Sequence, residues 1–576
     1  MLLFRNSGQP IQGCFDRQDS ILAGSRCLLL ISLALLALSV SVTASVPATA
    51  TATSPPPQSQ SAPGQEIGSM YIRQYRVDGG SNLLSKIQIE EAVYPFLGPG
   101  RTENDVEQAR AALEKAFRDK GYQTVAVQIP QQQVSRGVVV LQVVEVKVGQ
   151  LRVKGSHYFL PSEIKKEATS MSEGTVPDFN EVTKDIVALN QNADRKVTPV
   201  LRAGIVPGTV DIDLNVKDSL PLHGSLELNN RFNHDTKPLR LSGALSYDNL
   251  WQAGQKIGAT FQIAPQRLSD SESFSGYYIL PVPKVSWLSL MAQGSQQNSS
   301  VAISNGMASV GDGTVIGLRA LITLPQGKDY YHSLSFGVDY KHFLPANQFS
   351  GSITYFPWSA NYSMTVSGSG GVTDLNLGLI FNVRGMGASP SQFNDRRSLG
   401  TGVSANTNDS GDGSFIYLKG DLSHTHDLPV GFQLYGKIQG QVSDQQLVDT
   451  EQFSAGGFSN ARGYLESSET GDDALFGTFE LRSPSVAHFL GKTINEWRFY
   501  AFSDNGKLWL YNTGQGVGTY TYNLASVGVG SRIQFLDHLN GEVVLGLPLI
   551  SKNMTDTNNK SIVPAQLLTF RIWGEF

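Results

Sequence analysis

Along more than half of this chain, apolar and polar residues alternate one by one instead of following helical spacing. The last segment, 568–576, shows the pattern well, since one face of it collects Leu568, Phe570, Ile572 and Phe576. Successive side chains point to opposite faces of a β-strand, so such a segment offers lipid an apolar face and water a polar one. The pattern predicts a transmembrane β-barrel.

The C-terminal three-fifths of the chain contains 16 segments of this kind by our count. Most are close to the roughly 9–11 residues that a tilted strand needs to cross a bilayer. A closed sheet leaves no unpaired backbone groups in lipid, and an even strand number is typical of bacterial barrels. The segments begin near residues 222, 239, 255, 274, 284, 314, 332, 353, 370, 414, 431, 474, 496, 525, 540 and 567.

The connections between these segments differ in length in a regular way. Long ones are expected after the fifth, ninth and eleventh strands, at 294–313, 385–413 and 444–473. Short ones follow the fourth, tenth and fourteenth strands, at 281–283, 427–430 and 537–540. Long outer loops opposite tight periplasmic turns are typical of outer-membrane barrels. A soluble two-sheet sandwich is the alternative, but it does not need such asymmetry.

The N-terminal region predicts export from the cytoplasm. A run of apolar residues, Cys27–Val42, follows Arg26 and ends in small residues, which indicates a signal peptide over 1–44 with cleavage after Ala44. Both cysteines of the chain lie within this segment, so we expect an exported protein without disulfides. Residues 45–67 are rich in Pro, Ser and Thr and read as a flexible linker.

Two stretches, 68–147 and 148–219, repeat one order of elements: a strand, two helices and two strands. The sequence YRVDG at 75–79 is echoed by LRVKG at 151–155. One α+β domain with accidental similarity is the alternative. A small three-stranded sheet keeps a strand edge unpaired, and such an edge can add a strand from an extended client chain.

The second helix of the first repeat has clear boundaries. Thr102 and Asp105 predict a capping box at its start, and Gly121 can end it. Its buried face is predicted to consist of Val106, Ala109, Leu113 and Phe117.

Two short motifs in the barrel region carry the candidate functional residues. One lies in the 444–473 connection and the other on the predicted thirteenth strand. The candidate residues are Arg462, Gly463, Tyr464, Phe502, Asp504 and Gly506.

Alternation along the thirteenth strand places Phe502 and Asp504 on the lumen face, opposite Phe499. A loop folded back into the lumen could pair Arg462 with Asp504. Removing one partner of such a pair in a partly desolvated site costs about 3–5 kcal/mol. If Arg462 is instead a solvated loop charge, the pairing is worth about 0–1 kcal/mol. Spacing does not decide between these alternatives.

These features together resemble the outer-membrane transporters of two-partner secretion, the TpsB-type, ShlB/FhaC/HecB-like family of the POTRA-plus-barrel superfamily. The resemblance covers about 68–576. It implies a mainly β protein, with two small α+β POTRA modules (68–147 and 148–219) followed by a 16-stranded transmembrane β-barrel (220–576). The family's V-R-G-[YF] tetrad is ARGY here, with Ala461 in place of Val, and its F-x-D-x-G motif is complete.

The resemblance also implies a function, a location and a set of partners. We expect outer-membrane translocation of an unfolded, β-helical exoprotein of filamentous haemagglutinin or haemolysin type. It would dock on periplasmic POTRA modules and pass through the lumen of a lipid-embedded barrel. The six candidate residues would latch the 444–473 loop, which would gate this channel. Because the 45–67 linker cannot form an amphipathic plug helix, the folded-in loop is the expected closure. A barrel-assembly insertase and a passive porin or adhesin remain alternatives.

Other chemistry is sparse in the sequence. Residues 408–413 (NDSGDG) lack the closing Glu of a calcium loop and are predicted to form a polar outer loop. Residues 514–518 (GQGVG) lack the Lys of a phosphate-binding loop and are predicted to form an ordinary loop. His424 and His426 share a strand face and are expected to be structural. With a formal net charge of -5, the chain predicts no nucleic-acid partner. We expect no enzymatic activity, no cofactor and no metal site.

Overall fold

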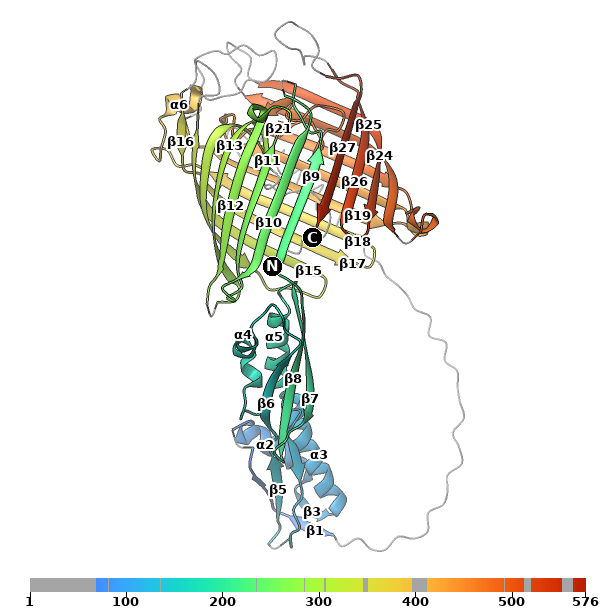
Figure 1. Cartoon of the computed structure of the whole chain (residues 1–576). Coiled ribbons are helices and arrows are strands. Elements are labelled where there is room, and N and C mark those ends of the chain that lie inside the picture. Colours follow the sequence, from blue (N-terminus) through green and yellow to red (C-terminus); the bar gives the residue numbers. More distant parts are fainter. Residues whose placement is uncertain are drawn as a thin grey trace. The chain divides into compact units, whose positions relative to one another are not determined.

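The computed structural model describes residues 69–551 and 563–576, except 81, 135, 235, 284, 305–306, 345–350, 396–411, 492 and 512–518. The predicted signal segment, the linker, the 514–518 loop and most of the 408–413 loop lie outside the described residues. The described chain divides into two compact units between Pro221 and Leu222 (Figure 1). In these residues, no helix has the length and apolar character that crossing a membrane requires.

The first unit contains two sheets of three strands with one topology. In each sheet the first strand runs parallel to the last, which lies in the middle, and the remaining strand is antiparallel to it. The first module contains β2 (Gln74–Asp78), α2 (Lys86–Val93), α3 (Glu103–Asp119), β4 (Ala126–Gln128) and β5 (Val138–Val144), with β1 (Met70–Ile72) paired to β3 (Gly98–Arg101). The second contains β6 (Lys147–Lys154), α4 (Pro161–Glu167), α5 (Phe179–Leu189), β7 (Arg195–Ala203) and β8 (Thr209–Asp218).

Helix α3 follows the sequence prediction closely. Asp105 Oδ2 accepts hydrogen bonds from the backbone N–H and the hydroxyl of Thr102, each at 2.8 Å. The positive φ of +112° at Gly121 ends the turn after the helix. The predicted apolar face is confirmed as part of the module core, and it consists of Val106, Ala109, Leu113 and Phe117.

In the second unit, the described residues form a closed barrel of 16 strands, each antiparallel to its neighbours. The last strand pairs with the first, from Arg571 opposite Asn229 to Glu575 opposite Ser225. A short extra strand, β16 (Ile353–Tyr355), pairs with the end of β15. The barrel strands are β9 (Leu222–Asn229), β10 (Arg240–Leu250), β11 (Gln255–Ile263), β12 (Ser271–Pro281), β13 (Leu288–Ser304), β14 (Met307–Thr323), β15 (Tyr330–Phe343), β17 (Trp358–Gly368), β18 (Gly371–Phe381), β19 (Ile416–Asp427), β20 (Gln433–Ser443), β23 (Asp473–Arg482), β24 (Ile494–Tyr511), β25 (Thr519–Phe535), β26 (Leu539–Pro548) and β27 (Leu567–Glu575).

The predicted strand number is confirmed, but the prediction of a long connection at 294–313 is wrong. Strand β13 continues to Ser304 and β14 already begins at Met307, so most of this stretch is a paired hairpin. Its residues are mostly polar or small, and strand pairing needs backbone hydrogen bonds rather than an apolar face. Strand β25 also begins earlier than predicted, at Thr519 instead of near 525, because its first residues pair with the end of β24 and its Tyr522 and Leu524 are buried. Strand β17 begins at Trp358, after the short β16, instead of near 353.

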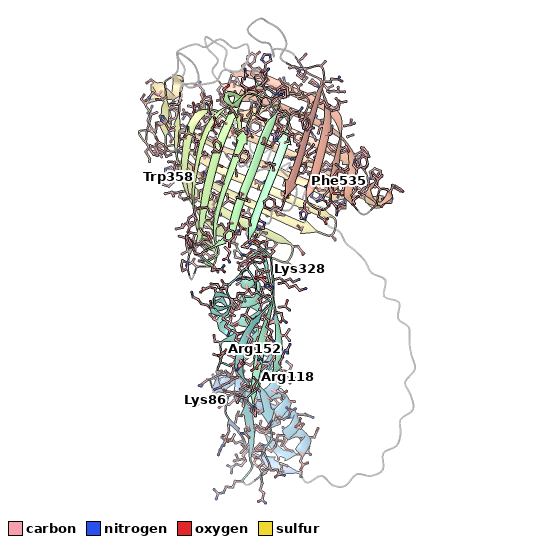
Figure 2. All side chains as sticks on the ribbon, viewed as in Figure 1. Lys86, Arg118, Arg152, Lys328, Trp358 and Phe535 are labelled. Carbon is pink, nitrogen blue, oxygen red and sulfur yellow. The ribbon has the colours of Figure 1, made fainter. Side chains whose placement is uncertain are left out.

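The alternation of side chains separates the two surfaces of the barrel wall. On the outside, Phe336 stacks on Trp358 with ring centroids 5.6 Å apart. Figure 2 labels Trp358 on the barrel wall. On the inside, Asp339 of β15 pairs with Arg319 of β14 at 2.6 Å. This division is the one that a lipid-embedded barrel requires.

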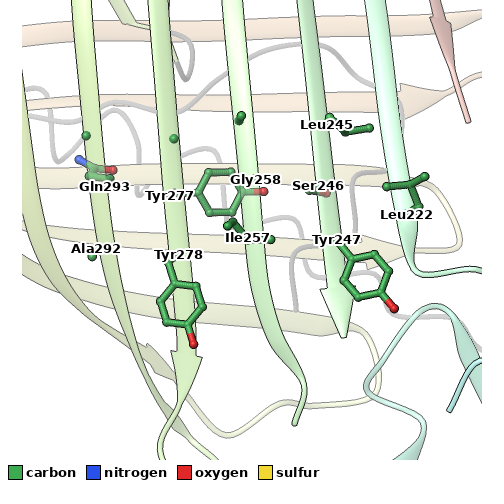
Figure 3. Close-up of a pocket in the computed structure, with 13 residues that line it drawn as sticks. Leu222, Leu245, Ser246, Tyr247, Ile257, Gly258, Tyr277, Tyr278, Ala292 and Gln293 are labelled. Carbon is green, nitrogen blue, oxygen red and sulfur yellow. The ribbon is translucent and has the colours of Figure 1, made fainter. Parts of the chain in front are cut away.

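The wall also carries a shallow apolar groove of about 610 Å³ across β9 to β13. Its floor is low because Ala259, Gly276 and Gly294 lie opposite one another on adjacent strands. Tyr247 and Tyr278 project along one side of it (Figure 3). This groove lies away from the candidate residues of the sequence analysis.

Candidate gate inside the barrel

The connection between β20 and β23, residues 444–472, is here called the lid loop. It contains a short hairpin, β21 (Phe453–Ala455) with β22 (Glu469–Gly471). Between these strands the chain reaches Arg462, whose partners are lumen-facing side chains in the middle of the barrel strands. The lid loop therefore folds into the lumen.

Arg462 is the most strongly bound residue of the lid loop. Its backbone N–H and its Nε donate to Asp504 Oδ2, both at 2.9 Å, and its Nη2 donates to Asp504 Oδ1 at 2.8 Å. Its Nη1 donates to Glu480 on the neighbouring strand. Arg462 is 5% exposed, Glu480 2% and Asp504 1%. One guanidinium thus satisfies two buried carboxylates on β23 and β24.

Aromatic rings complete the surroundings of Arg462. The guanidinium carbon lies 3.8 Å from the ring centroid of Phe502 and 5.8 Å from that of Tyr500. Burial opposes the charge and would lower the pKa of Arg462. Hydrogen bonding to Asp504, together with the charges of Asp504 and Glu480, raises this pKa above the ordinary value. The guanidinium therefore stays protonated in a site that excludes most water.

The two carboxylates belong to a larger network on the same wall of the lumen. Glu480 also binds Arg482 at 2.7 Å and lies 3.6 Å from Arg532. Glu542 on β26 accepts hydrogen bonds from Arg532, Tyr500 and Arg571. Buried charges that alternate in sign compensate one another, whereas removal of one member leaves its partners unpaired.

Tyr464 and Gly463 hold the loop against β25 and β26. The Tyr464 hydroxyl donates to the carbonyl groups of Ala525 (3.0 Å) and Ile550 (2.7 Å), and the ring is fully buried. Gly463 has a φ of +102°, and its backbone lies against that of Gly546. A Cβ on Gly546 would come within 2.5 Å of the Gly463 nitrogen.

The structure thus brings five of the six predicted residues into direct contact with the loop or the wall beneath it. Gly506 acts by being small: a Cβ at this position would lie 2.0 Å from the ring of Phe476, so only glycine leaves room for that ring. The lumen orientation predicted for Phe502 and Asp504 is confirmed, since both are buried inside while Phe499 is exposed outside. Between the two alternatives for Arg462, the buried pair is the observed one.

Three residues that hold the lid loop were not predicted from the sequence. Glu480 shares Arg462 with Asp504, and its only signal is a carboxylate at a lumen-facing position of its strand. Arg231 donates to Glu466 of the loop, with Arg231 Nε 2.7 Å from Glu466 Oε1. Gly546 gives no signal in the sequence, because its need for a small side chain arises from a loop 83 residues earlier in the chain.

Comparison with known proteins gives consistent results. Residues 208–533 match the family model "Haemolysin secretion/activation protein ShlB/FhaC/HecB", and residues 70–145 match "POTRA domain, ShlB-type". The outer membrane transporter CdiB of Dickeya dadantii is 21% identical over 392 residues, which are 66% of each chain. The chain thus spans just under two thirds of this curated relative, and the match to CdiB of Escherichia coli spans 29% of that protein.

Solved structures share the architecture. CdiB from Escherichia coli has a TM-score of 0.58 at 19% identity, covering 98% of this chain and 100% of that one. BamA from Haemophilus ducreyi, lacking POTRA domains 1–3, has a TM-score of 0.52 at 13% identity, covering 88% and 99%. At these identities the likeness concerns the fold.

The closed barrel and the POTRA-type modules are those of an outer-membrane barrel protein, with its modules in the periplasm. The chain belongs to the ShlB/FhaC/HecB family of haemolysin secretion/activation proteins, whose members are transporters rather than enzymes.

Proposed function

We propose that this protein exports an unfolded exoprotein by two-partner secretion. The client docks on the POTRA modules, threads through the lumen when the lid loop leaves its site, and folds outside the cell. Arg462, Gly463, Tyr464, Phe502, Asp504 and Gly506 act as the loop–lumen latch. The observation that carries this proposal is the lid loop itself, which occupies the lumen and is held there by buried polar contacts that can break and reform.

Docking of an extended client calls for a strand edge with free backbone groups, and β2 offers one. Gln74 N–H donates to the carbonyl of Gly137, so alternate residues of β2 face β5. Tyr75 and Val77 consequently direct their N–H and C=O groups away from the sheet. In the described residues these outward groups have no hydrogen-bond partner. An added strand could pair with both positions without requiring one client sequence.

Two other edges of the modules are protected. On β4, the outward N–H of Val127 donates to Glu114 at 3.4 Å. On β7, the side chain of Asn190 binds both backbone groups of Val197, at 2.6 and 3.0 Å. Pro199, two residues along β7, has no N–H to offer. Side-chain caps and proline are the usual means by which edges avoid pairing.

The edge of β6 is covered by the segment 173–175. Val148 N–H donates to the carbonyl of Thr175 at 2.8 Å, and Gly174 N–H donates to the carbonyl of Val148 at 2.7 Å. Among the described strands of the modules, β2 is therefore the edge on which no side chain caps an outward residue, whereas β7 leaves only Leu201 and Ala203 uncapped beyond Pro199. This difference supports β2 as the docking edge.

Deleting 71–218 is expected to abolish export while the barrel still inserts into the outer membrane. Secretion into the medium is measured with a co-expressed exoprotein of filamentous haemagglutinin type, and insertion by heat-modifiable mobility of the barrel. Export that persists without the modules would show that their docking role is wrong. Loss of other barrels from the outer membrane would instead favour the insertase alternative.

Val77→Pro tests the β2 edge more finely. The substitution removes an outward N–H but leaves the hydrogen bonds between β2 and β5 intact, because Val77 does not face β5. We expect secretion to fall by about tenfold, since edge pairing depends on these backbone groups. Leu201→Pro is the matched control, because Leu201 faces outward on β7, an edge that Pro199 and the Asn190 cap on Val197 already interrupt. Equal secretion by the two variants would refute docking at β2.

A further inference from the structure

The base of the lid loop has its own buried ionic contact, separate from the latch at its tip. Glu451 lies 8 residues after the end of β20 and is 4% exposed. Its carboxylate accepts hydrogen bonds from Lys341 Nζ (2.5 Å) and from the hydroxyl groups of Tyr355 (2.6 Å) and Tyr417 (2.5 Å). These three partners belong to β15, β16 and β19. The contact joins the loop to strands that take no part in the Arg462 network.

Electrostatics favours a charged Glu451 despite its burial. Burial raises the pKa of this carboxyl group. The charge of Lys341 and the hydrogen bonds from Lys341, Tyr355 and Tyr417 lower it by more than burial raises it, so the pKa lies below its ordinary value. The ammonium of Lys341 lies 5.8 Å from the ring centroid of Tyr355. A neutral residue at 451 would leave Lys341 as an uncompensated charge on this wall.

Apolar packing strengthens the same contact. Leu447 and Val448, from the first residues of the lid loop, are 1% and 2% exposed. They belong to an apolar cluster built from the ends of several strands and from helix α6 (Pro390–Asp395). The buried members of this cluster are Phe343, Ile353, Tyr355, Phe393, Phe415, Tyr417, Leu447 and Val448. The base of the loop is thus packed like a small core.

Between base and tip, the loop turns at two buried glycines. Gly456 and Gly457 have φ values of +98° and +90°. Side chains at both positions would collide with Leu465, Ser468 or Glu466 of the same loop. Two consecutive glycines in this conformation separate the segment held by Glu451 from the segment held by Arg462.

We infer that Glu451 is a positioning residue that fixes the base of the lid loop, and that closure of the lumen requires this anchor in addition to the Arg462 latch. The inference rests on the proposed gating role of the loop. With the base fixed, the tip returns to the same place on β23 and β24 after each client has passed. Without it, the base drifts from the β15–β19 wall and the tip no longer seals the lumen.

The test is single-channel recording of the purified full-length protein in planar lipid bilayers. Glu451→Gln keeps the shape of the side chain but removes its charge, and we expect about tenfold more open time because the buried ion pair that holds the base is lost. Glu496→Gln is the matched control, because Glu496 pairs with Arg498 at 2.5 Å but its side chain is 48% exposed. It should leave open time at the wild-type level.

A double variant separates loss of the anchoring contact from the effect of an unpaired charge. Lys341→Met combined with Glu451→Gln removes both charges, so no buried charge remains unpaired, and open time should still stay raised because the ionic contact at the base of the loop is missing. Wild-type open time in this double variant would show that an unpaired ammonium, and not loss of the anchor, opens the channel. Heat-modifiable mobility verifies that each barrel is folded. Wild-type open time in Glu451→Gln, with Arg462→Ala open, would overturn the base anchor and leave the gate intact. Wild-type open time in both variants would overturn the gating proposal itself.

Discussion

Arg462→Ala is expected to open the channel and to impair export of the exoprotein. The substitution leaves Asp504 buried without its counter-charge, while Glu480 keeps Arg482, and loss of one partner of a buried pair costs about 3–5 kcal/mol. The loop can avoid this penalty by leaving its site, which admits water to both carboxylates. Conductance in planar bilayers measures the opening, and secretion into the medium measures the effect on transport.

The exposed Arg384 provides the control for Arg462→Ala. Arg384 pairs with Asp412 at 2.8 Å, but its side chain is 61% exposed, so Arg384→Ala should change neither readout. Arg462→Lys should give an intermediate result, because an ammonium cannot reproduce the fork that binds two oxygens of Asp504. Wild-type conductance and secretion in Arg462→Ala would mean that the pair is only structural.

The barrel was predictable because its sequence pattern is local. Strand alternation requires only neighbouring residues, and the same pattern recurs often enough to give the strand number. Where a stretch consists mostly of polar or small residues, as in 294–313, this signal weakens and the prediction became a loop. Helix α3 was predictable for a similar reason, since its capping box and apolar face are set by residues three or four positions apart.

The site was predictable only in part because most of its contacts join distant segments. Arg462 and Asp504 were found through their motifs and through the lumen register of β24. Glu451, in contrast, depends on Lys341, Tyr355 and Tyr417, which are 110, 96 and 34 residues away. A carboxylate in a polar loop has no local mark that distinguishes an anchor from a solvated charge. Three-dimensional packing supplies that distinction.

Gly546→Ala is expected to displace the lid loop without altering any charge. The new Cβ would lie 2.5 Å from the nitrogen and 2.7 Å from the Cα of Gly463, and backbone atoms cannot move aside as a flexible side chain can. Gly463 in turn is fixed between Arg462 and Tyr464, so the whole tip has to shift. The latch contacts would be lost even though Arg462, Asp504 and Glu480 are all present.

Limited trypsin digestion of the detergent-solubilised variant measures this displacement directly. Arg462 is 5% exposed in the closed loop, so wild-type protein should resist cleavage after it, whereas Gly546→Ala should be cut there within a barrel that stays folded. Gly436→Ala is the matched control, because its Cβ would meet no atom within 4 Å. Equal resistance of both variants would mean that the backbone contact between Gly463 and Gly546 is not needed for closure. Cleavage in Gly546→Ala, together with raised conductance, would establish that shape and charge hold the lid independently.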